Sequence, residues 1–269
     1  MTTLPQPAPA HRTPLPIRRV LFAVAALLAL FLVLVGAFNV IDHASRHTTT
    51  ERASFDGVRS LVIEDASDVR LTGAPAGAPL EVVTRATEGL RTPERSVERG
   101  PGGELQLSSS CPGFLGGHCS VDYTISVPAG TVLRAEADAG DVVAERLTTT
   151  EPLVLDSSAG DVEAIDVTAP SIELSSSAGD VEGRGLSAER IDLHSSAGDV
   201  EASLDTPAQR LVAESSAGDV ELLVPDVTYD LSASSSAGDV DARVASDPDS
   251  RRVLTAHSSA GDVSVAVRP

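Results

Sequence analysis

The chain has 269 residues, of which 42% are hydrophobic and only 3% aromatic, and it contains no tryptophan. This is enough for one or two domains whose cores consist mainly of valine, leucine and alanine. All 20 basic residues are arginine, and the formal net charge of −19 argues against a nucleic-acid-binding protein, because phosphates need neutralising cations. Two cysteines allow one disulfide and exclude a cysteine-rich scaffold.

Residues 20–41 form an apolar segment of 22 residues without a charge. As a helix it would be about 33 Å long, against about 30 Å for the hydrocarbon core of a bilayer. A cleaved signal peptide is the alternative, but its apolar stretch is usually about 7 to 15 residues and ends at a small-x-small site, which is not clear in this sequence. The sequence therefore predicts an uncleaved transmembrane helix that contacts the lipid bilayer through residues 20–41.

The charges that flank this segment predict its orientation. Arg12, Arg18 and Arg19 precede it and Asp42 follows it. Positively charged flanks stay in the cytoplasm. We therefore expect a cytoplasmic N-terminal segment at residues 1–19, a linker at residues 42–57 and an extracytoplasmic β-repeat domain at residues 58–269 of a single-pass protein.

The two cysteines lie close together in the predicted exterior domain. Cys111 and Cys119 flank a glycine-rich stretch between two alternating, strand-like runs. An oxidising compartment lets a disulfide persist, so we expect these two residues to be bonded. Metal binding by Cys111, His118 and Cys119 is the alternative, but no second Cys or His cluster supplies a fourth ligand.

A six-residue block, SSAGDV or a close variant, recurs along the second half of the chain. Its glycines are 19 to 23 residues apart, a period typical of repeat architectures. They are Gly140, Gly160, Gly179, Gly198, Gly218, Gly238 and Gly261. A weaker copy, DASDVRL at residues 65–71, suggests that the pattern begins earlier.

Fixed positions around each glycine are apolar. Seven residues before it stand Leu133, Leu153, Ile172, Ile191, Leu211, Leu231 and Leu254. Two residues after it stand Val142, Val162, Val181, Val200, Val220, Val240 and Val263. Apolar positions alternate on each side of the glycine, which is the pattern of a strand with one buried face. Each repeat is therefore predicted to be two short strands joined at a Gly-Asp corner.

Two all-β architectures satisfy this alternation: a β-solenoid with one repeat per coil, and an antiparallel array in which each Gly-Asp is a hairpin turn. Independent hairpins need a compatible turn but not the same six residues. Coils stacked in register place serine on serine and alanine on alanine, so a bulky variant would disturb both neighbours. The near-identity of the blocks favours the β-solenoid, preceded by one transmembrane α-helix.

The corner residues have structural roles that need no ligand. The glycine is expected to adopt a backbone conformation that is closed to side chains. The aspartate after it is expected to accept a hydrogen bond within its own turn. These aspartates are Asp141, Asp161, Asp180, Asp199, Asp219, Asp239 and Asp262.

A second acidic column follows two residues later, at Glu163, Glu182, Glu201, Glu221 and Asp241. Carboxylates on adjacent coils, about 4.8 Å apart, would repel each other by about 0.9 kcal/mol per pair in water. One hypothesis is that the two columns bind a divalent cation such as Ca²⁺, or a cationic partner. The alternative is a solvated face that maintains solubility, and it is favoured because no dense calcium-repeat motif is present. No other cofactor is expected.

The many serines do not indicate an enzyme. The column four residues before the glycine contains Asp156, Ser175, His194, Glu214, Ser234 and His257, but it repeats no fixed pairing of nucleophile and base. No G-x-S-x-G, P-loop or dinucleotide-binding motif occurs. We therefore expect a non-catalytic protein.

The apolar N-terminal segment, the run VDYTISVPAGTVLRAEADAGDV and the serial L-x-L-x-S-S-A-G-D-V units resemble the bacterial putative-adhesin family of β-strand-repeat proteins of unknown function. The resemblance covers about residues 58–269. It implies a β-helix-like fold, often beside a membrane anchor, and an adhesive or envelope-related role. It supplies no catalytic residues.

From these features we expect a membrane-anchored protein with a binding, adhesive or scaffolding role at the cell envelope. The rival interpretation is a sensory or regulatory component of an envelope-stress response. The chain's last strand is expected to form the terminal coil of the solenoid, where only Arg268 and Pro269 blunt the edge. That coil is the predicted site of self-association or of pairing with an envelope protein.

Overall fold

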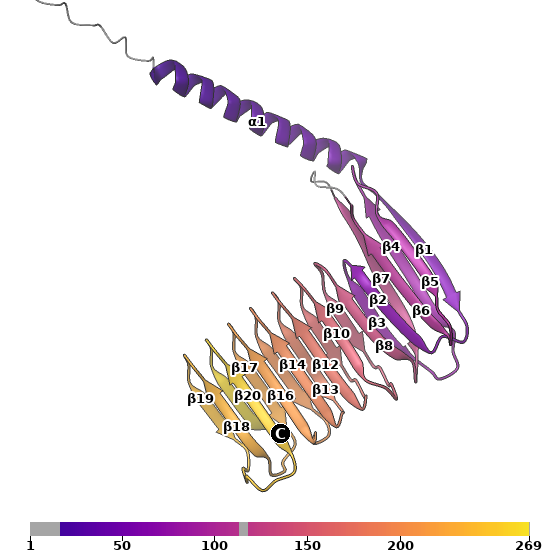
Figure 1. The fold of residues 1–269 in the computed structure, drawn as a ribbon, viewed down its shortest axis with the longest axis vertical. Helices are drawn as coiled ribbons and strands as arrows, with labels where there is room; N and C mark the ends of the chain where they lie inside the picture. The colour runs from indigo at the N-terminus through magenta and orange to yellow at the C-terminus, as the bar shows by residue number, and fades with distance from the viewer. Residues whose placement is uncertain (1–16, 113–117, 269) are drawn as a thin grey trace, which may run out of the picture.

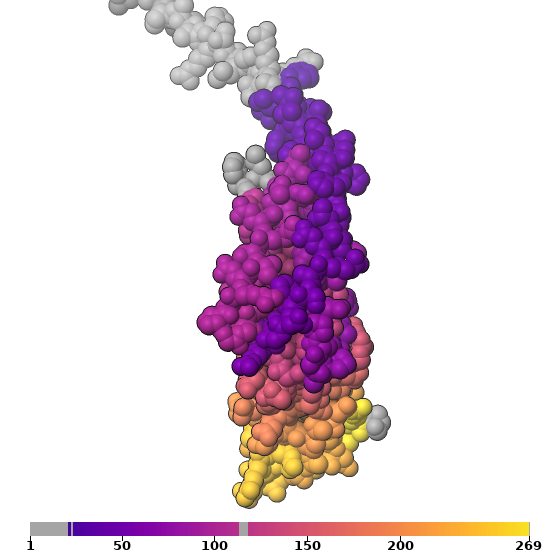
Figure 2. Space-filling model, turned by 90° about the vertical axis from the view of Figure 1, so that its right-hand side faces the viewer, coloured from indigo at the N-terminus to yellow at the C-terminus, as the bar shows by residue number. Residues whose placement is uncertain are grey.

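The computed structural model describes residues 17–112 and 118–268. Most of the predicted cytoplasmic segment, including Arg12, and the terminal Pro269 lie outside these residues. In the described part, helix α1 (Ile17–Ser45) is followed by 21 strands that form one sheet of 11 strands and one of 10. The helix extends from one end of the two-sheet body, and the C-terminal repeats lie at the other end (Figures 1 and 2).

The first sheet contains, in spatial order, β1 (His47–Phe55), β4 (Leu80–Glu88), β7 (Cys119–Pro128), β3 (Val69–Ala74), β9 (Val142–Glu145), β11 (Val162–Ile165), β13 (Val181–Leu186), β15 (Val200–Leu204), β17 (Val220–Val224), β21 (Val263–Val267) and β19 (Val240–Arg243). The second contains β18 (Asp230–Ser235), β20 (Val253–Ser258), β16 (Arg210–Ser215), β14 (Arg190–Ser195), β12 (Ser171–Ser176), β10 (Leu153–Ser157), β8 (Val132–Ala137), β2 (Ser60–Ala66), β6 (Glu104–Ser110) and β5 (Glu94–Arg99). Each repeat supplies one strand to each sheet.

The predicted β-solenoid-like stacking is confirmed. Strands of adjacent repeats pair in parallel and in register, so that Leu153 lies between Leu133 and Ile172, and Val162 between Val142 and Val181. These columns are buried, except at Leu231 and Val240 of the last coil in the stack, and form one continuous core between the sheets. The Gly-Asp segments are therefore corners of a coil and not hairpin turns.

The weak copy at residues 65–71 is the corner of the coil formed by β2 and β3. Val69 pairs with Val142, as the valine of a genuine repeat would. Beyond this coil lie β6 and β7, and then strands that pair antiparallel: β5 with β6, and β4 with both β1 and β7. The repeat pattern thus extends to residue 60, as the sequence suggested.

Residues 42–57 are not a linker. Residues 42–45 complete α1, and residues 47–55 form β1, which pairs along its whole length with β4. The sequence HTTTERASF does not indicate a strand, because it shows no apolar alternation. Strand β1 lies at the edge of the sheet, and eight of its nine residues are exposed.

The order of the last coils differs from the order in the sequence. The last repeat, β20 and β21, lies between the Gly218 repeat and the Gly238 repeat, so β18 and β19 form the terminal coil. The expectation that the chain's last strand forms the terminal coil is therefore wrong. The inserted repeat places Val265 in the core where the terminal coil has Ala242, and burying the two extra carbons contributes about 1.5 kcal/mol.

Two connections allow the last two coils to exchange their places in the stack. Residues 225–229 carry the chain past the inserted coil, and residues 244–252 bring it back, which accounts for the 23-residue spacing. Tyr229 joins them: its buried side chain donates a hydrogen bond to the carbonyl of Pro225 at 3.1 Å, and its backbone N–H bonds to Ala245. Arg268 then ties β21 inward, through its backbone N–H to Val224 and its guanidinium to Asp205.

Candidate binding surface

The SSAGDV block is an interlocking corner between adjacent coils. The hydroxyl of the first serine of each block donates a hydrogen bond to the carbonyl of the glycine in the adjacent coil; from Ser176 to Gly160 the distance is 2.8 Å. This serine is buried in every block except that of the terminal coil, where Ser235 is half-buried. Equivalent bonds of 2.7 to 2.8 Å join the other repeats, at Ser157, Ser195, Ser215, Ser235 and Ser258. The serine column is therefore structural.

The corner glycines are required for close approach and not for an unusual backbone. None of the seven is among the described residues with positive φ. Instead, a Cβ on Gly198 would overlap the carbonyl of Gly179, and the same overlap recurs at the other copies. The expectation of a conformation closed to side chains is wrong at these positions, because it is the neighbouring coil that excludes the side chain.

The aspartates also act between coils and not within their own turns. The Oδ1 atom of Asp180 accepts a hydrogen bond from the backbone N–H of Asp199 at 2.8 Å, and Asp199 does the same for Asp219. The ladder begins at Asp68, which accepts from Asp141, and ends at Asp239, whose N–H donates to Asp262. The bonds in between are those of Asp161 to Asp141, Asp180 to Asp161 and Asp262 to Asp219. The whole column is exposed.

This ladder gives the aspartate column a role without a ligand. Each carboxylate satisfies an N–H at a corner where the sheet ladder is interrupted, and charge-assisted bonds of this kind are stronger than neutral ones. The attraction offsets part of the repulsion between stacked carboxylates. Among the described residues, no group of three His, Cys, Asp or Glu is arranged to hold a metal ion. The binding of Ca²⁺ stays a prediction.

The second acidic column is shorter than the sequence suggested. Glu163, Glu182, Glu201 and Glu221 stack in register, but Ser264 of the inserted repeat separates Glu221 from Asp241. These glutamates differ in their charge partners. Arg184 forms ion pairs with both Glu163 and Glu182, whereas no described residue forms an ion pair with Glu201 or Glu221.

Glu201 is the carboxylate of this column that its surroundings destabilise. Desolvation first, then repulsion from Glu182, Glu221 and Asp199, raises the pKa of Glu201, and only Arg184 opposes the shift. A shallow depression of about 260 Å³ lies here, lined by the three glutamates at 182, 201 and 221 together with Arg184. Of the three glutamates that line it, Glu182 is paired with Arg184, and Glu201 and Glu221 form no ion pair with a described residue.

The coil exchange also brings together polar residues that are far apart in the sequence. Glu214 lies between His194 and His257 in register, and Ser234 follows His257. The Ser234 hydroxyl and His257 Nδ1 are 3.1 Å apart, but no hydrogen bond joins Glu214 to either ring in the part of the chain that the structure describes. A nucleophile, a base and an oriented carboxylate are thus not assembled, and the face is open to water.

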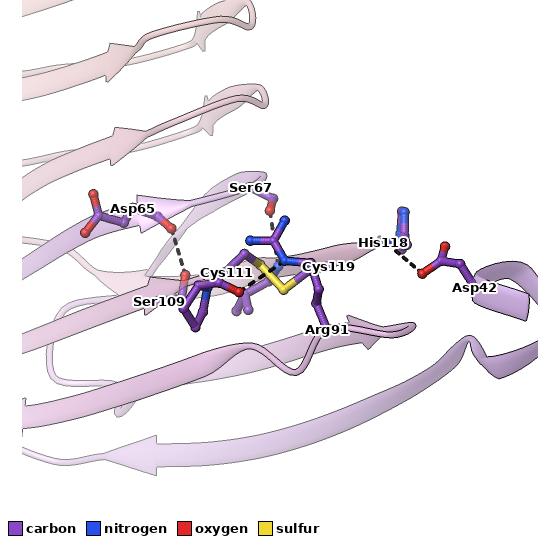
Figure 3. Close-up of a disulfide and its surroundings, with 10 residues drawn as sticks. Asp42, Asp65, Ser67, Arg91, Ser109, Cys111, His118 and Cys119 are labelled. Atoms are coloured by element: carbon purple, nitrogen blue, oxygen red, sulfur yellow. Dashed lines mark hydrogen bonds between the residues drawn. A yellow bond between two sulfur atoms is a disulfide. The ribbon is translucent and has the colours of Figure 1, made fainter. Parts of the chain in front are cut away.

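A disulfide joins Cys111 and Cys119 at the helix end of the molecule (Figure 3), with a Cα–Cα distance of 5.9 Å. It links the end of β6 in one sheet to the start of β7 in the other. A cavity of about 530 Å³ lies beside it, lined by Asp65, Ser109 and Asp138 among others. Desolvation, followed by repulsion from Asp138 and Glu64, raises the pKa of Asp65.

Asp42 fixes α1 to this end of the β-domain. Its buried Oδ1 accepts hydrogen bonds from the backbone N–H groups of Leu90 at 3.1 Å and His118 at 2.9 Å, and its Oδ2 pairs with Arg46 at 3.2 Å (Figure 3). Gly89 leaves room for this contact, because a Cβ there would lie 2.5 Å from Oδ1. In the sequence, Asp42 stands out only as a charge that flanks the apolar segment. The overlooked signal is an acid four residues before an arginine at the end of an apolar helix.

Several solved structures are similar to this chain at low sequence identity. A putative adhesin from Bacteroides fragilis is 15% identical, with 82% of this chain and 97% of that chain covered and a TM-score of 0.45. A putative adhesin from Parabacteroides merdae is 11% identical, with 82% and 96% covered and a TM-score of 0.43. A putative cell adhesion protein from Clostridium sporogenes is 12% identical, with 82% and 100% covered and a TM-score of 0.36.

No curated protein matches the chain in sequence. The family model described as Toastrack DUF4097 matches residues 104–269, which is more than half of the chain and includes every SSAGDV repeat. That match agrees with the resemblance that the repeats suggested. The chain belongs to the Toastrack DUF4097 family.

Proposed function

We propose that this protein is a membrane-anchored, extracytoplasmic β-repeat protein that acts at the cell envelope by binding, in an adhesive or scaffolding role, and not by catalysis. The observation that carries the proposal is that α1, whose apolar span is exposed, is fixed to the helix end of the β-domain through Asp42.

The helix supports a retained anchor. Within α1, Val24–Ser45 is long and apolar enough to cross a membrane, a property that a signal sequence shares. Most of its large apolar side chains between Leu21 and Ile41 are exposed, which suits lipid contact. A signal peptide is removed from the mature protein, and cleavage after this segment would remove or free Asp42, whose two backbone contacts belong to the folded β-domain.

The charge pattern and the disulfide support an exterior β-domain. The arginines Arg12, Arg18 and Arg19 precede the apolar segment, and such residues are retained on the cytoplasmic side. A bond between Cys111 and Cys119 persists in an oxidising compartment. Together they support an extracytoplasmic location for residues 47–268.

The stack itself supports binding. Its repeated serines, glycines and aspartates are used to join coils, and the exposed Ser234–His257 pair has no carboxylate hydrogen-bonded to the ring among the described residues. What it offers is a rigid, acidic body that holds its far end away from α1 (Figure 1).

The proposal is tested on the full-length chain expressed in a bacterium. We expect the intact N-terminus in the mature protein by mass spectrometry, retention in membranes washed with sodium carbonate, and digestion of the β-domain by protease added outside intact spheroplasts. As a matched control, Asp42→Ala should keep the membrane fraction but expose the junction to protease. A mature chain that begins after residue 41, or a β-domain protected from external protease, would overturn the proposal.

A further inference from the structure

The terminal coil leaves both sheets open at the far end of the stack. Strand β18 ends the second sheet and β19 ends the first, and neither has a strand on its outer side among the described residues. All four residues of β19 are exposed, and Val240, buried in the equivalent position of every other repeat, is 46% exposed. Open edges of this kind pair readily with another strand.

The opposite end of the stack is built differently. There the edge strands β1 and β5 are tied to each other by side chains: Arg95 pairs with Glu51 at 3.2 Å, and the Arg99 guanidinium lies 5.0 Å from the Phe55 ring. These two strands pair antiparallel with their neighbours, whereas the strands of the far end pair in parallel.

The edge strands also differ in whether they could pair with their own copy. Two copies of one strand related by a twofold axis pair antiparallel, and directly opposed residues then lie on the same face of the sheet. In β5, one face carries Glu94 and Glu98 and the other Arg95 and Arg99, so self-pairing always opposes like charges. In β1, Glu51 and Arg52 are adjacent and so lie on opposite faces, which means that self-pairing cannot bring these opposite charges together.

Strand β19 has the opposite arrangement. Asp241 and Arg243 are two residues apart and share the outer face, where they form an exposed ion pair within the strand. Antiparallel pairing centred on Ala242 places Asp241 of each copy opposite Arg243 of the other, and Val240 opposite Val244 on the inner face. Opposite charges across a sheet stabilise it and like charges destabilise it.

The second sheet does not oppose this arrangement. Strand β18 reads DLSASS, with Asp230, Ser232 and Ser234 on its outer face and the half-buried Leu231 and Ala233 on its inner face. Only a twofold axis through Asp230 itself would oppose like charges. The same twofold axis would extend the open end of the core with small apolar side chains from both copies.

We propose that the terminal coil binds the terminal coil of a second copy of this chain, head to head, through β19 and β18. Helix α1 lies at the opposite end of the molecule (Figure 1), so the two anchors of such a pair point away from each other. The pair therefore bridges two facing membranes. This inference rests on the proposed adhesive function and names its partner.

The first test uses charge exchange on the full-length chain in vesicles of neutral phosphatidylcholine, with two dye-labelled populations mixed and clustering followed by energy transfer. Wild-type vesicles should cluster. Asp241→Arg and Arg243→Asp should each reduce clustering to the level of protein-free vesicles, because each opposes like charges. Vesicles with Asp241→Arg should cluster with vesicles carrying Arg243→Asp, and the double variant should cluster with itself.

Each other result contradicts the proposal. If wild-type vesicles do not cluster, head-to-head pairing is wrong. If the single variants cluster as well as wild type, or if the mixed pair does not recover, the contact lies elsewhere on the molecule or involves another partner. The substituted side chains are exposed, so circular dichroism of each variant should match wild type.

A second test reports position and does not require the anchor. Antiparallel neighbours have Cα atoms about 4.5 to 5.5 Å apart, within the range that a disulfide spans. Ala242→Cys in the detergent-solubilised full-length chain should therefore form a covalent dimer on oxidation, whereas Ser264→Cys, on the interior strand β21, should not. Both native cysteines are already bonded. A cleaved helix would leave this dimer intact, and a monomeric Ala242→Cys chain would overturn the pairing alone.

Discussion

The helix end and the repeat stack use the same two sheets but different means to hold them. Around β1 and β4 to β7, strands pair antiparallel, a disulfide joins the sheets, and charged side chains tie the edges. From β8 onward every pairing is parallel, and cohesion comes from identical corner residues bonded from coil to coil. The difference teaches that the stack depends on repetition: a change at one coil acts on its neighbours, whereas the helix end depends on single contacts.

The largest expected effect comes from Gly198→Ala, in the middle of the stack. The new methyl group would overlap the Gly179 carbonyl, and coils on both sides prevent relief, so we expect a loss of about 3 kcal/mol or more in the free energy of unfolding. Gly238→Ala makes the same overlap with Gly261, but the terminal coil can move outward, so its loss should be smaller. Urea unfolding followed by circular dichroism measures both, and equal losses would show that the terminal coil is as confined as the interior.

The paired substitution Cys111→Ser and Cys119→Ser tests the helix end. Opening this short loop should cost about 2 to 3 kcal/mol by loop-closure entropy. We expect the loss to stay local, with faster amide hydrogen exchange in β6, β7 and at His118, and little change in β12 to β16. Faster exchange throughout the stack would contradict the separation of the two regions.

The aspartate ladder is tested at Asp199. Removing its carboxylate leaves the Asp219 N–H without its acceptor, so Asp199→Ala should destabilise the chain by about 1 kcal/mol. Asp199→Asn keeps an oxygen acceptor and removes one of the stacked charges, so its loss should be smaller. The two midpoints of urea unfolding give the comparison, and identical values would show that the ladder bonds contribute nothing measurable.

In the column of glutamates, removing a charge at Glu201 should raise the free energy of unfolding, whereas removing the Asp199 carboxylate should lower it. The pKa of Glu201 is raised in the folded chain, so the folded state loses stability relative to the unfolded state as the pH rises from the usual pKa of a glutamate through the folded pKa. Well below both pKa values the carboxyl is protonated in both states and does not affect stability. Glu201→Gln should therefore stabilise the chain at pH 7, by about 0.5 kcal/mol, and by less at pH 4. Glu163→Gln is the matched control, because Glu163 already forms an ion pair with Arg184. Equal gains at both pH values would show that repulsion is not the cause.

Calcium should have the smallest effect. The aspartates already accept backbone hydrogen bonds, and Glu163 and Glu182 already share Arg184. We therefore expect thermal melts of the full-length chain in millimolar calcium and in chelator to agree within about 1 °C, well below the shift that tight binding would produce. A clear rise in calcium would restore the cation hypothesis, and Glu201→Gln would then be expected to reduce that rise.

The sequence predicted what periodicity controls. The apolar columns that contain Leu153 and Val162 are in register because a two-residue alternation and a regular spacing leave one way to stack the coils. The sequence did not predict the features for which several arrangements of the coils satisfy the same pattern. The repeats at Gly238 and Gly261 are so similar that either could be terminal, and the longer spacing and Tyr229 were the only signs of exchange.

The roles of the corner residues could not be predicted for a different reason. A glycine that needs positive φ and a glycine that needs room look the same in a sequence, and so do an aspartate that bonds within its turn and one that bonds to the next coil. Only the distance between coils separates them, as at Gly198 and Asp199. Strand β1 and the Asp42 contact were hidden because neither has an apolar pattern.

The exchanged coil has a consequence for how the chain folds as it is made. The Gly238 repeat emerges before the Gly261 repeat and can dock on β16 and β17, the place that the later repeat finally occupies. Nascent domains begin to fold before synthesis ends, so this early docking would have to be undone. A chain synthesised slowly would then form an intermediate in which the Gly238 repeat occupies the position of the Gly261 repeat. The Gly238 coil would have to detach before the Gly261 coil could bind, and the rate of this step would limit formation of the native far end.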